Sequence, residues 1–313
     1  MIKKMKIVVP PLKIQGIKTK LIPMIKQSIL WNDSKIWIEP FLGSGSVLFN
    51  MQPQNAIVSD TNKHIINVYK GIQDNSINSS NVRTFLESEG AKLEVSNGEY
   101  YYDVRERFNL HGDPLDFIFL NRSCFNGMMR FNKKGDFNVP FCRKPERFQK
   151  ALITRICNQI QLVSDIMQNK NWTFKVADWK DTVSNASHND FIYLDPPYIG
   201  LHADYYNTWD ENDAFELLKT MNNTSAGYAL SMWKSNDFRS NYYLKHWNGI
   251  EFTTDHFYHV GASLNNRKSV IESLIVSEQY ARINLESTNE LDIQELDDTE
   301  NTNMPIAKQL SLF

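Results

Sequence analysis

The chain has few cysteines and no long apolar segment. Its three cysteines, Cys124, Cys142 and Cys157, are odd in number and show no Cys-x-x-Cys spacing. This excludes a disulfide framework and gives no sign of a zinc site, so we expect no bound metal. No apolar run reaches transmembrane length, and the basic N-terminal segment is too short for a secretory signal. These absences predict a protein of the reducing cytoplasm.

A net positive charge is also lacking, because 34 basic and 36 acidic side chains leave a formal charge of -2. Clustered Lys and Arg supply most of the affinity of proteins for nucleic acid, so this total argues against such a partner. The charges are unevenly distributed, however. Residues 1–32 hold seven lysines and no acid, residues 121–155 are also basic, and residues 283–313 hold seven acids and one lysine. The body without its acidic end is therefore mildly cationic and suits DNA.

Hydrophobic residues make up 42% of the 313 residues, which is enough for a sizeable core. Short β-rich runs alternate with helical stretches in two blocks, and this pattern predicts an α/β fold with a Rossmann-like, mostly parallel sheet. The expected strands are 35–40, 55–60, 172–178, 190–195 and 227–232, followed by a hairpin-like pair at 250–261 and 268–277. The expected helices are 44–51, 62–71, 147–167, 212–221 and 236–244.

The strongest local motif is Asp195-Pro196-Pro197-Tyr198, directly after an apolar strand. It offers a carboxylate acceptor, a backbone carbonyl held by the fixed φ of proline, and an aromatic face. Together these groups can bind an exocyclic amino group and stack on its base. Open α/β sheets bind ligands at the carboxyl ends of their strands, where this motif falls. The structural alternative is a rigid Pro-Pro turn.

A glycine-containing turn, Phe41 to Gly45, follows the first strand and opens a helix. Gly43 and Gly45 permit a tight turn and a close approach of a ligand to the backbone. The alternative is a plain connection between strand and helix.

Two aspartates follow strands. Asp60 ends the second strand, where an acid commonly binds a ribose hydroxyl. Asp178 follows a later strand and can accept a hydrogen bond from an adenine amino group. In isolation, each is also a candidate helix cap.

These residues in this order resemble the Dam-type (D12 class, alpha group) DNA adenine-N6 methyltransferases. The resemblance covers about residues 8–278. It is carried by PPLKIQGIK (10–18), EPFLGSGSVLFN (39–50), SDTNKHIINVYK (59–70), LNRSCFNGMMRFNKKGDFNVPF (120–141), VADW (176–179) and LDPPY (194–198). It implies S-adenosylmethionine as the methyl donor and double-stranded DNA as the partner, in a bacterial or phage-infected cell.

The resemblance also implies roles for individual residues. The implied cofactor-binding residues are Lys18, Phe41, Gly43, Gly45, Asp60, Asp178 and Asp195. The implied catalytic residues, which hold the target adenine, are Asp195, Pro196, Pro197 and Tyr198. The candidate DNA-binding residues are Arg122, Phe125, Asn126, Arg130, Lys133 and Lys134. The chain departs from the family before Lys18, because Ile14 replaces an aromatic residue and Gln15-Gly16 replaces a Gly-Gly pair.

The implied reaction is direct in-line methyl transfer to adenine N6 after the base has left the duplex. In that reaction Phe125 is expected to wedge into the base stack, Arg130 to contact guanine, and Lys133 with Lys134 to contact phosphates. Two alternatives stay open: a cytosine-N4 methyltransferase, which more often carries Ser in place of Asp195, and a non-catalytic DNA-binding descendant. A GATC site is a first guess, and restriction-linked and stand-alone enzymes fit equally.

The expected organisation is a catalytic domain of residues 1–74 and 151–280, interrupted by an inserted target-recognition region of residues 75–150. Residues 281–313 are expected to form an acidic flexible tail. The last five residues, Gln309-Leu310-Ser311-Leu312-Phe313, resemble the pentapeptide that binds the bacterial sliding clamp, with Gln309, Leu310, Leu312 and Phe313 as the binding residues. The alternative is that this segment folds back onto the body.

Overall fold

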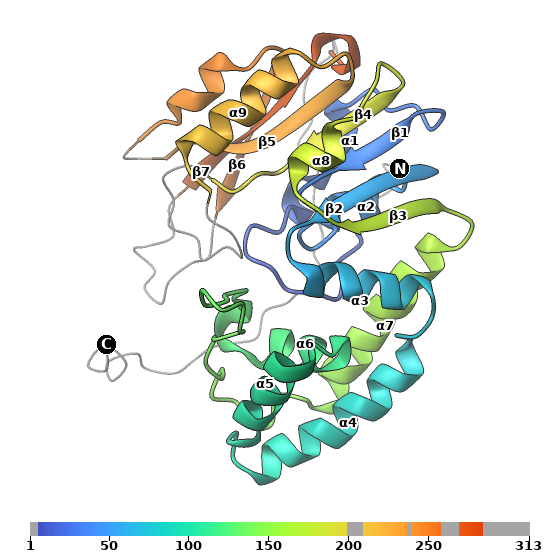
Figure 1. Ribbon diagram of the computed structural model, residues 1–313, viewed down its shortest axis with the longest axis vertical. Helices are drawn as coiled ribbons and strands as arrows, with labels where there is room; N and C mark the ends of the chain where they lie inside the picture. Colours follow the sequence, from blue (N-terminus) through green and yellow to red (C-terminus); the bar gives the residue numbers. More distant parts are fainter. Residues whose placement is uncertain (1–5, 199–208, 237–238, 258–268, 284–313) are drawn as a thin grey trace, which may run out of the picture.

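The computed structural model describes residues 6–198, 209–236, 239–257 and 269–283, and its centre is a seven-stranded sheet (Figure 1). The strand order is β3-β2-β1-β4-β5-β7-β6. The first five strands in this order are parallel, whereas β7 is antiparallel to both β5 and β6. The strands are β1 (Ile36–Glu39), β2 (Asn55–Asp60), β3 (Asn171–Val176), β4 (Asp190–Leu194), β5 (Gly227–Asn236), β6 (Ile250–Phe257) and β7 (Ser269–Val276). The predicted Rossmann-like α/β fold is confirmed, including the antiparallel pair at one edge.

The order of the strands reverses between β1 and β4, which lie side by side at the middle of the sheet. Ile38 of β1 pairs with Ile57 of β2 on one side and with Ile192 of β4 on the other. The chain leaves β1 toward β2 and leaves β4 toward β5, so the two connections diverge. In such sheets this divergence opens a crevice at the carboxyl ends of the two strands, where ligands bind.

Side chains of the central strands alternate between two apolar clusters, one on each face of the sheet. On one face Trp37 stacks between Phe191 and Tyr193, with ring centroids 5.4 and 5.9 Å away. This cluster also contains side chains of the helices that lie between residues 19 and 167. On the other face Ile38 and Ile192 pack with residues of the helices that flank β4 and β5. The alternation is the period-two pattern of buried strands.

The helices that cover the two faces differ in number and size. The larger cluster is formed with η1 (Thr19–Leu21), α1 (Ile22–Ser28), α2 (Ser46–Met51), α3 (Lys63–Gln73), α4 (Ser79–Val95), α5 (Tyr100–His111), α6 (Pro114–Ser123) and α7 (Lys150–Met167). The smaller cluster is formed with α8 (Trp179–Val183), α9 (Glu211–Asn222) and η3 (Tyr242–His246). Short 3-10 turns also occur at η2 (Phe125–Gly127) and η5 (Glu278–Tyr280). Within the described ranges no helix is long and apolar enough to cross a bilayer.

The inserted region is largely helical. In Figure 1, α4, α5 and α6 lie below the sheet, with α6 next to α3, and α7 returns the chain to β3. Two of these helices start at side-chain caps, since the Asn78 side chain accepts N–H bonds at α4 and the Asp113 side chain does so at α6. The helix predicted at 147–167 is confirmed as α7, which packs against α4. The insert therefore shares one apolar cluster with the sheet instead of having its own core.

One predicted helix is wrong. Residues 236–244 were expected to be helical, but β5 continues to Asn236 and only the short η3 follows from Tyr242. The extension is possible because β5 pairs with β7 through a bulge between Trp233 and Ser235. Pairing with a long neighbouring strand has here outweighed the local helical pattern.

An irregular hairpin connects α6 to α7, and we call residues 124–142 the 124–142 hairpin. Cys124 pairs with Phe141 at its base, and Phe131 pairs with Phe137 near its tip. Between them Asn132 closes the turn, because its side-chain oxygen accepts the backbone N–H groups of Lys134 and Asp136. The hairpin packs against the helices through buried Phe137 and Val139, and its basic turn is exposed.

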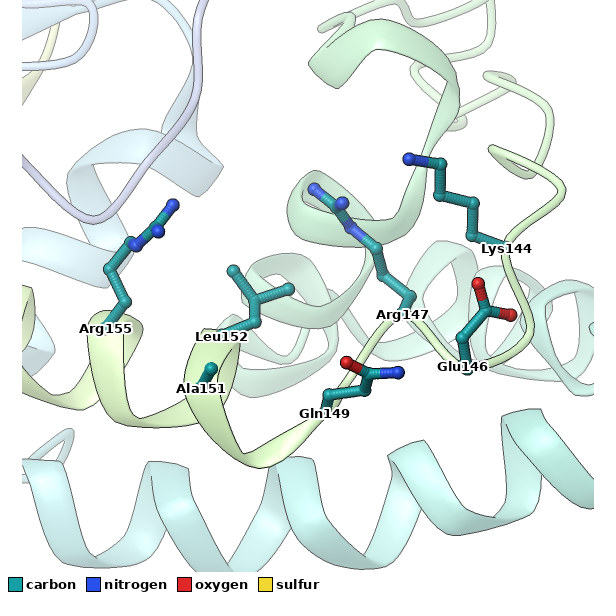
Figure 2. A pocket seen from close by; sticks show the side chains of 7 residues that line it. All are labelled: Lys144, Glu146, Arg147, Gln149, Ala151, Leu152 and Arg155. Carbon is teal, nitrogen blue, oxygen red and sulfur yellow. The ribbon is translucent and has the colours of Figure 1, made fainter. Parts of the chain in front are cut away.

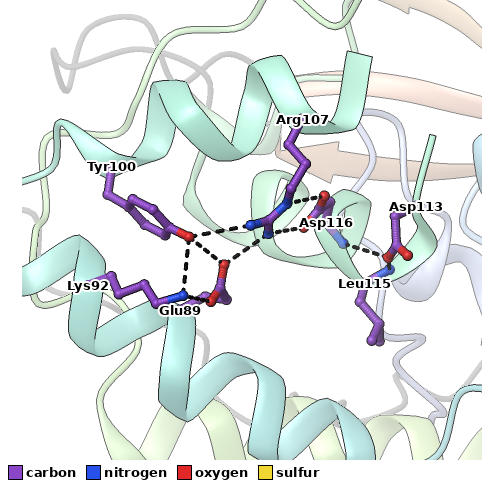
Figure 3. Close-up of polar contacts among 7 residues, drawn as sticks. All are labelled: Glu89, Lys92, Tyr100, Arg107, Asp113, Leu115 and Asp116. Carbon is purple, nitrogen blue, oxygen red and sulfur yellow. Dashed lines mark hydrogen bonds and ion pairs between the residues drawn. The ribbon is translucent and has the colours of Figure 1, made fainter. Parts of the chain in front are cut away.

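A charged network ties α4, α5 and α6 together (Figure 3). Arg107 donates to both oxygens of buried Asp116 and to buried Glu89, which also accepts from Lys92 and Tyr100. Burial raises the pKa of Glu89, but hydrogen bonds from Lys92, Arg107 and Tyr100 outweigh it and leave the pKa lowered. The network therefore stabilises the fold above the usual Glu pKa, and this contribution is lost as the pH falls through the folded-state value.

Replacement of the central cation is expected to destabilise the insert. Arg107→Met leaves two buried carboxylates without their shared partner, so we expect the free energy of unfolding to fall by about 1–3 kcal/mol. Urea unfolding measures this loss. The matched control is Arg83→Met, which removes a half-exposed Arg83–Glu87 pair and a long 3.5 Å hydrogen bond to Thr154, and should cost less than about 0.5 kcal/mol. Equal losses in the two variants would contradict a structural role for the network.

Candidate functional site

An ion pair lies at the carboxyl ends of β1 and β4. The ammonium of Lys18, which precedes η1, is 2.7 Å from Oδ1 of Asp195, directly after β4. Lys18 is 4% exposed and Asp195 is 22% exposed, so the pair is sheltered but open on the Asp195 side. The ammonium also donates to the Gly16 carbonyl at 2.9 Å. Lys18 therefore reaches the site despite the Gln15-Gly16 departure noted above.

Three carboxyl groups and one ammonium set the electrostatics of this crevice. Burial raises the pKa of Asp195, the charge and hydrogen bond of Lys18 oppose this rise, and the charge of Glu272 adds to it. Burial also raises the pKa of Glu39, the last residue of β1, to about 8, although Trp37 donates a hydrogen bond to it. Glu39 is therefore mostly protonated near neutral pH. The crevice then holds less negative charge than its three acids suggest.

Tyr198 also contacts the Lys18 ammonium. Its ring centroid is 5.1 Å from the Lys18 ammonium, a cation–π contact. Its hydroxyl donates to Oε2 of Glu272 at 2.9 Å, and Glu272 is fully buried on β7. The two contacts hold Tyr198 between the Lys18 ammonium and Glu272, which lies in the middle of β7. An aromatic face is thus held beside the Asp195 carboxylate.

The glycine turn after β1 is linked to the end of β2 through Asp60. One oxygen of Asp60 accepts the N–H of Gly43 at 2.9 Å, and the other accepts that of Asn62 at 2.8 Å. Burial raises the pKa of Asp60, and these two N–H groups lower it in part. The cap interpretation of Asp60 is wrong, because Asn62 is the residue that caps α3. Asp60 instead joins two neighbouring strand ends.

Both glycines of the turn have left-handed backbone angles, with φ of 50° at Gly43 and 71° at Gly45. A Cβ atom at Gly45 would lie 2.7 Å from the ring of Phe49, so this position needs glycine for packing as well. Among the residues that the structure describes, a Cβ at Gly43 would meet nothing within 4 Å. The backbone at Gly43 therefore borders open space next to the Asp60 carboxylate.

The remaining predicted cofactor residues, Asp178 and Phe41, follow β3 and β1. Asp178 is exposed, and its side chain caps α8 by accepting the N–H of Lys180. The structural alternative for this residue is therefore realised. Phe41 is partly exposed and packs edge-on against Trp209, with centroids 5.5 Å apart.

The predicted DNA-binding residues separate into exposed and interior positions. Phe125 is 41% exposed, Asn126 has a left-handed φ of 53°, and Lys133 and Lys134 are exposed in the turn of the 124–142 hairpin. Arg130 is partly buried and donates from Nε to the side chain of Asn138 at 2.9 Å.

Arg122 corrects the prediction. It is 3% exposed and donates to the carbonyl of Pro11, so it holds the N-terminal segment against α6 instead of facing DNA. The basic composition of the segment concealed this role, because Arg is often exposed.

A basic pocket lies at the start of α7 (Figure 2). It is lined by Lys144, Glu146, Arg147, Gln149, Ala151, Leu152 and Arg155. Arg147 is fixed there because its Nε donates to the Arg122 carbonyl at 2.7 Å. The pocket thus extends the positive surface beyond the 124–142 hairpin.

Three residues of the crevice, Glu39, Glu272 and Trp209, were not predicted. Glu39 and Glu272 each lie in an apolar strand sequence, IWIE and SVIESLIV. An acid inside such a run indicates a buried carboxyl group with a polar partner, and this signal could have identified both residues. Trp209 gave no signal, because nothing in its local sequence connects it with Phe41. Within the described residues no group of three or more His, Cys, Asp or Glu side chains forms a metal site.

Comparison with known proteins connects this geometry to one family. Residues 15–259 match the model of the D12 class N6 adenine-specific DNA methyltransferases. The chain is 33% identical over 199 residues to a DNA adenine methylase of Serratia marcescens. That alignment covers 61% of this chain and 67% of the methylase. It is 32% identical over 226 residues to the type II methyltransferase M.MjaIII of Methanocaldococcus jannaschii, in an alignment that covers 65% of this chain and 75% of that protein. A DNA adenine methylase of Salmonella typhi is 31% identical over 214 residues, covering 66% and 70%.

Removal of the ammonium is expected to change the titration of its partner. In Lys18→Met the pKa of Asp195 should rise further, because burial and Glu272 then act without the opposing charge. NMR titration of carboxylate carbons follows this pKa. Lys20→Met is the control, since Lys20 is a neighbouring lysine on η1 and should leave the titration unchanged. An unchanged Asp195 titration in Lys18→Met would contradict the assigned electrostatics.

Proposed function

Because the chain belongs to the D12 class of N6 adenine-specific DNA methyltransferases, we propose that Lys18, Asp195 and Tyr198 form its target-adenine site. The observation that carries this proposal is the Lys18–Asp195 ion pair at the β1/β4 reversal, with the Tyr198 ring fixed beside it. The pair supplies a hydrogen-bond acceptor and the ring supplies a stacking surface, the two groups that an exocyclic amine on a flat base requires. This family assignment favours adenine N6 over the cytosine-N4 and non-catalytic alternatives.

The methyl donor of this site is proposed to be S-adenosylmethionine, which supplies an activated methyl group on a sulfonium. The residues present fit it, because Gly43 leaves open space beside the Asp60 carboxylate where a ribose can approach. Asp60 would accept from ribose hydroxyls. Phe41 and the Gly43 to Gly45 turn would lie along the cofactor. A contact between Asp178 and the cofactor adenine stays a prediction beside its cap role.

The chain's own groups would activate the amine by orientation and electrostatics. The N6 lone pair is delocalised into the adenine ring, which makes the amine a poor nucleophile. Acceptance of its hydrogens by Asp195 and by the Pro196 carbonyl would favour a more tetrahedral nitrogen. Pro197 would keep that carbonyl in place through its fixed φ. Lys18 would keep Asp195 ionised, so that it accepts and does not donate.

The target base would have to leave the duplex to reach this crevice. Extrusion costs a few kcal/mol, and stacking on one aromatic ring returns about 1–3 kcal/mol. Tyr198 alone therefore offsets only part of the cost. We propose that the 124–142 hairpin supplies the remainder, with Phe125 and Asn126 at the vacated stack and Arg130 on a guanine edge. Lys133, Lys134 and the basic pocket would bind phosphates.

The biological setting is proposed on the names of the relatives, which include both DNA adenine methylases and type II methyltransferases. The chain therefore fits a stand-alone enzyme and a restriction-linked one, acting in the cytoplasm of a bacterial or phage-infected cell. GATC is the first sequence to examine as its target.

The terminal pentapeptide lies outside the described residues, and clamp binding is proposed on its sequence alone. Deletion of residues 309–313 is expected to abolish binding to the sliding clamp and to leave thermal melting and methyl transfer to short oligonucleotides unchanged. Gel filtration with purified clamp provides the measurement. A lowered melting temperature with no clamp binding by the intact chain would instead support a segment that folds onto the body.

Loss of the Asp60 charge should weaken cofactor binding. Charged hydrogen bonds contribute about 1.5–3 kcal/mol, so Asp60→Asn is expected to raise the Kd for S-adenosylmethionine by about 10–100-fold in calorimetry. Asp181→Asn, an exposed carboxylate on α8, is the control and should leave this Kd within about two-fold. If Asp60→Asn also stays within two-fold, Asp60 does not hold the cofactor.

Two hairpin cations should affect DNA binding in different ways. Arg130→Ala is expected to relax sequence choice by about 1–3 kcal/mol at the base it contacts, because a bidentate contact is lost. Lys133→Ala should weaken binding to all sequences alike and reduce the salt slope by about 1. Methylation-sensitive sequencing and salt-dependent binding separate the effects. Identical specificity profiles for both variants would remove Arg130 from the base-contacting set.

A further inference from the structure

The Asp60 carboxylate is connected to the first turn of α3 by two successive hydrogen bonds. Its Oδ1 accepts the N–H of Asn62 at 2.8 Å, and the Asn62 side chain accepts the N–H of His64 at 3.0 Å. His64 is the second residue of α3 and therefore moves with this cap. A ligand that fixes the Asp60 carboxylate would also fix the turn that carries His64.

The His64 ring lies in a cage of three phenylalanines. It is 5% exposed and stacks on Phe131 with centroids 5.4 Å apart and planes 5° from parallel. The other walls are Phe108 of α5 at 4.6 Å and Phe117 of α6 at 5.5 Å. Phe131 belongs to the 124–142 hairpin. The His64 side chain therefore connects α3, which begins beside Asp60, to the hairpin proposed to read DNA.

The imidazole acts here as a neutral ring. Its Nδ1 is buried and has no hydrogen-bond partner among the described residues. Burial and, to a smaller extent, the charge of Lys63 together lower the pKa of His64 to about 4. The ring is therefore uncharged near neutral pH, and its contribution is the flat surface under Phe131. Phenylalanine can supply the same surface without a buried unpaired nitrogen.

A displacement of Phe131 would reach the recognition residues directly. Phe131 pairs with Phe137 across the hairpin and packs edge-on against it, with centroids 5.4 Å apart. Phe137 is itself held from α5, because its backbone N–H donates to the Asn109 side chain. Arg130 precedes Phe131 in the chain, and the Lys133 to Lys134 turn follows it. The His64 contact therefore lies next to the groups that would touch DNA.

We propose that His64 is a positioning residue that couples the cofactor site to the 124–142 hairpin. The proposal rests on the proposed function, since it needs a cofactor at Asp60 and DNA at the hairpin. Cofactor binding would order the Asp60–Asn62–His64 turn, so that the hairpin has a fixed platform before DNA arrives and less ordering remains to be done. Binding linkage is reciprocal, so DNA would tighten cofactor binding by the same factor.

The test compares DNA affinity of the full chain with and without saturating S-adenosylhomocysteine, using fluorescence anisotropy and a duplex that the wild-type chain methylates. The wild-type Kd is expected to fall at least about five-fold when the cofactor product is added. The ratio of the DNA Kd without S-adenosylhomocysteine to the Kd with it is the measure of coupling. In His64→Ala this ratio should fall to within two-fold of one, and His64→Phe should restore the wild-type ratio. Phe131→Ala, at a half-buried position of the hairpin, should lose the ratio as well. The Kd for S-adenosylhomocysteine alone should stay within two-fold in all variants.

The matched control is Val68→Ala, which opens a cavity at a buried position of the same helix without a ring contact to the hairpin. It should keep the wild-type ratio. The proposal is overturned if the wild-type ratio is close to one, if His64→Ala keeps the wild-type ratio, or if Val68→Ala lowers the ratio as much as His64→Ala does. Phe131→Ala alone decides the matter if His64→Ala does not fold. Failure of the wild-type chain to bind S-adenosylhomocysteine would instead refute the proposed function.

Discussion

The Lys18–Asp195 ion pair is the interaction on which the site depends. Asp195 follows a fully buried strand, and burial alone would favour its neutral form. Lys18 opposes this with an ammonium at 2.7 Å and also contacts the Tyr198 ring. The same cation therefore favours the ionised form of Asp195 and contacts the ring of Tyr198. Glu39 contributes little negative charge near neutral pH, since its pKa is about 8.

The sheet and the helical insert are bound together by shared packing. The apolar cluster on one face of the sheet extends through α3 into α4–α7, and α3 begins at the cap beside Asp60. The insert therefore keeps a defined position relative to the crevice, and the hairpin packs on helices that the Arg107 network holds together. Such a scaffold would hold the proposed adenine site and the proposed recognition hairpin in a fixed relation to each other.

Much of the fold was predictable because strand alternation is local. The central strands and the edge pair were predicted from apolar runs, and Asp195, Tyr198 and Gly43 from motifs at strand ends. The misses depend on distant partners. Arg122 has the composition of a DNA contact but bonds to Pro11, 111 residues away in the chain. Glu272 reaches Tyr198 across 74 residues, and the 236–244 helix yielded to pairing of β5 with β7.

The most direct measurement is a double-mutant cycle on Lys18 and Asp195, read as single-turnover methyl transfer to adenine N6 with the product identified by mass spectrometry. If the pair acts as one unit, Lys18→Met and Asp195→Asn together should slow transfer hardly more than Asp195→Asn alone, with a coupling energy of at least about 1 kcal/mol. Additive effects of the two substitutions would contradict the account, because each residue would then act without the other.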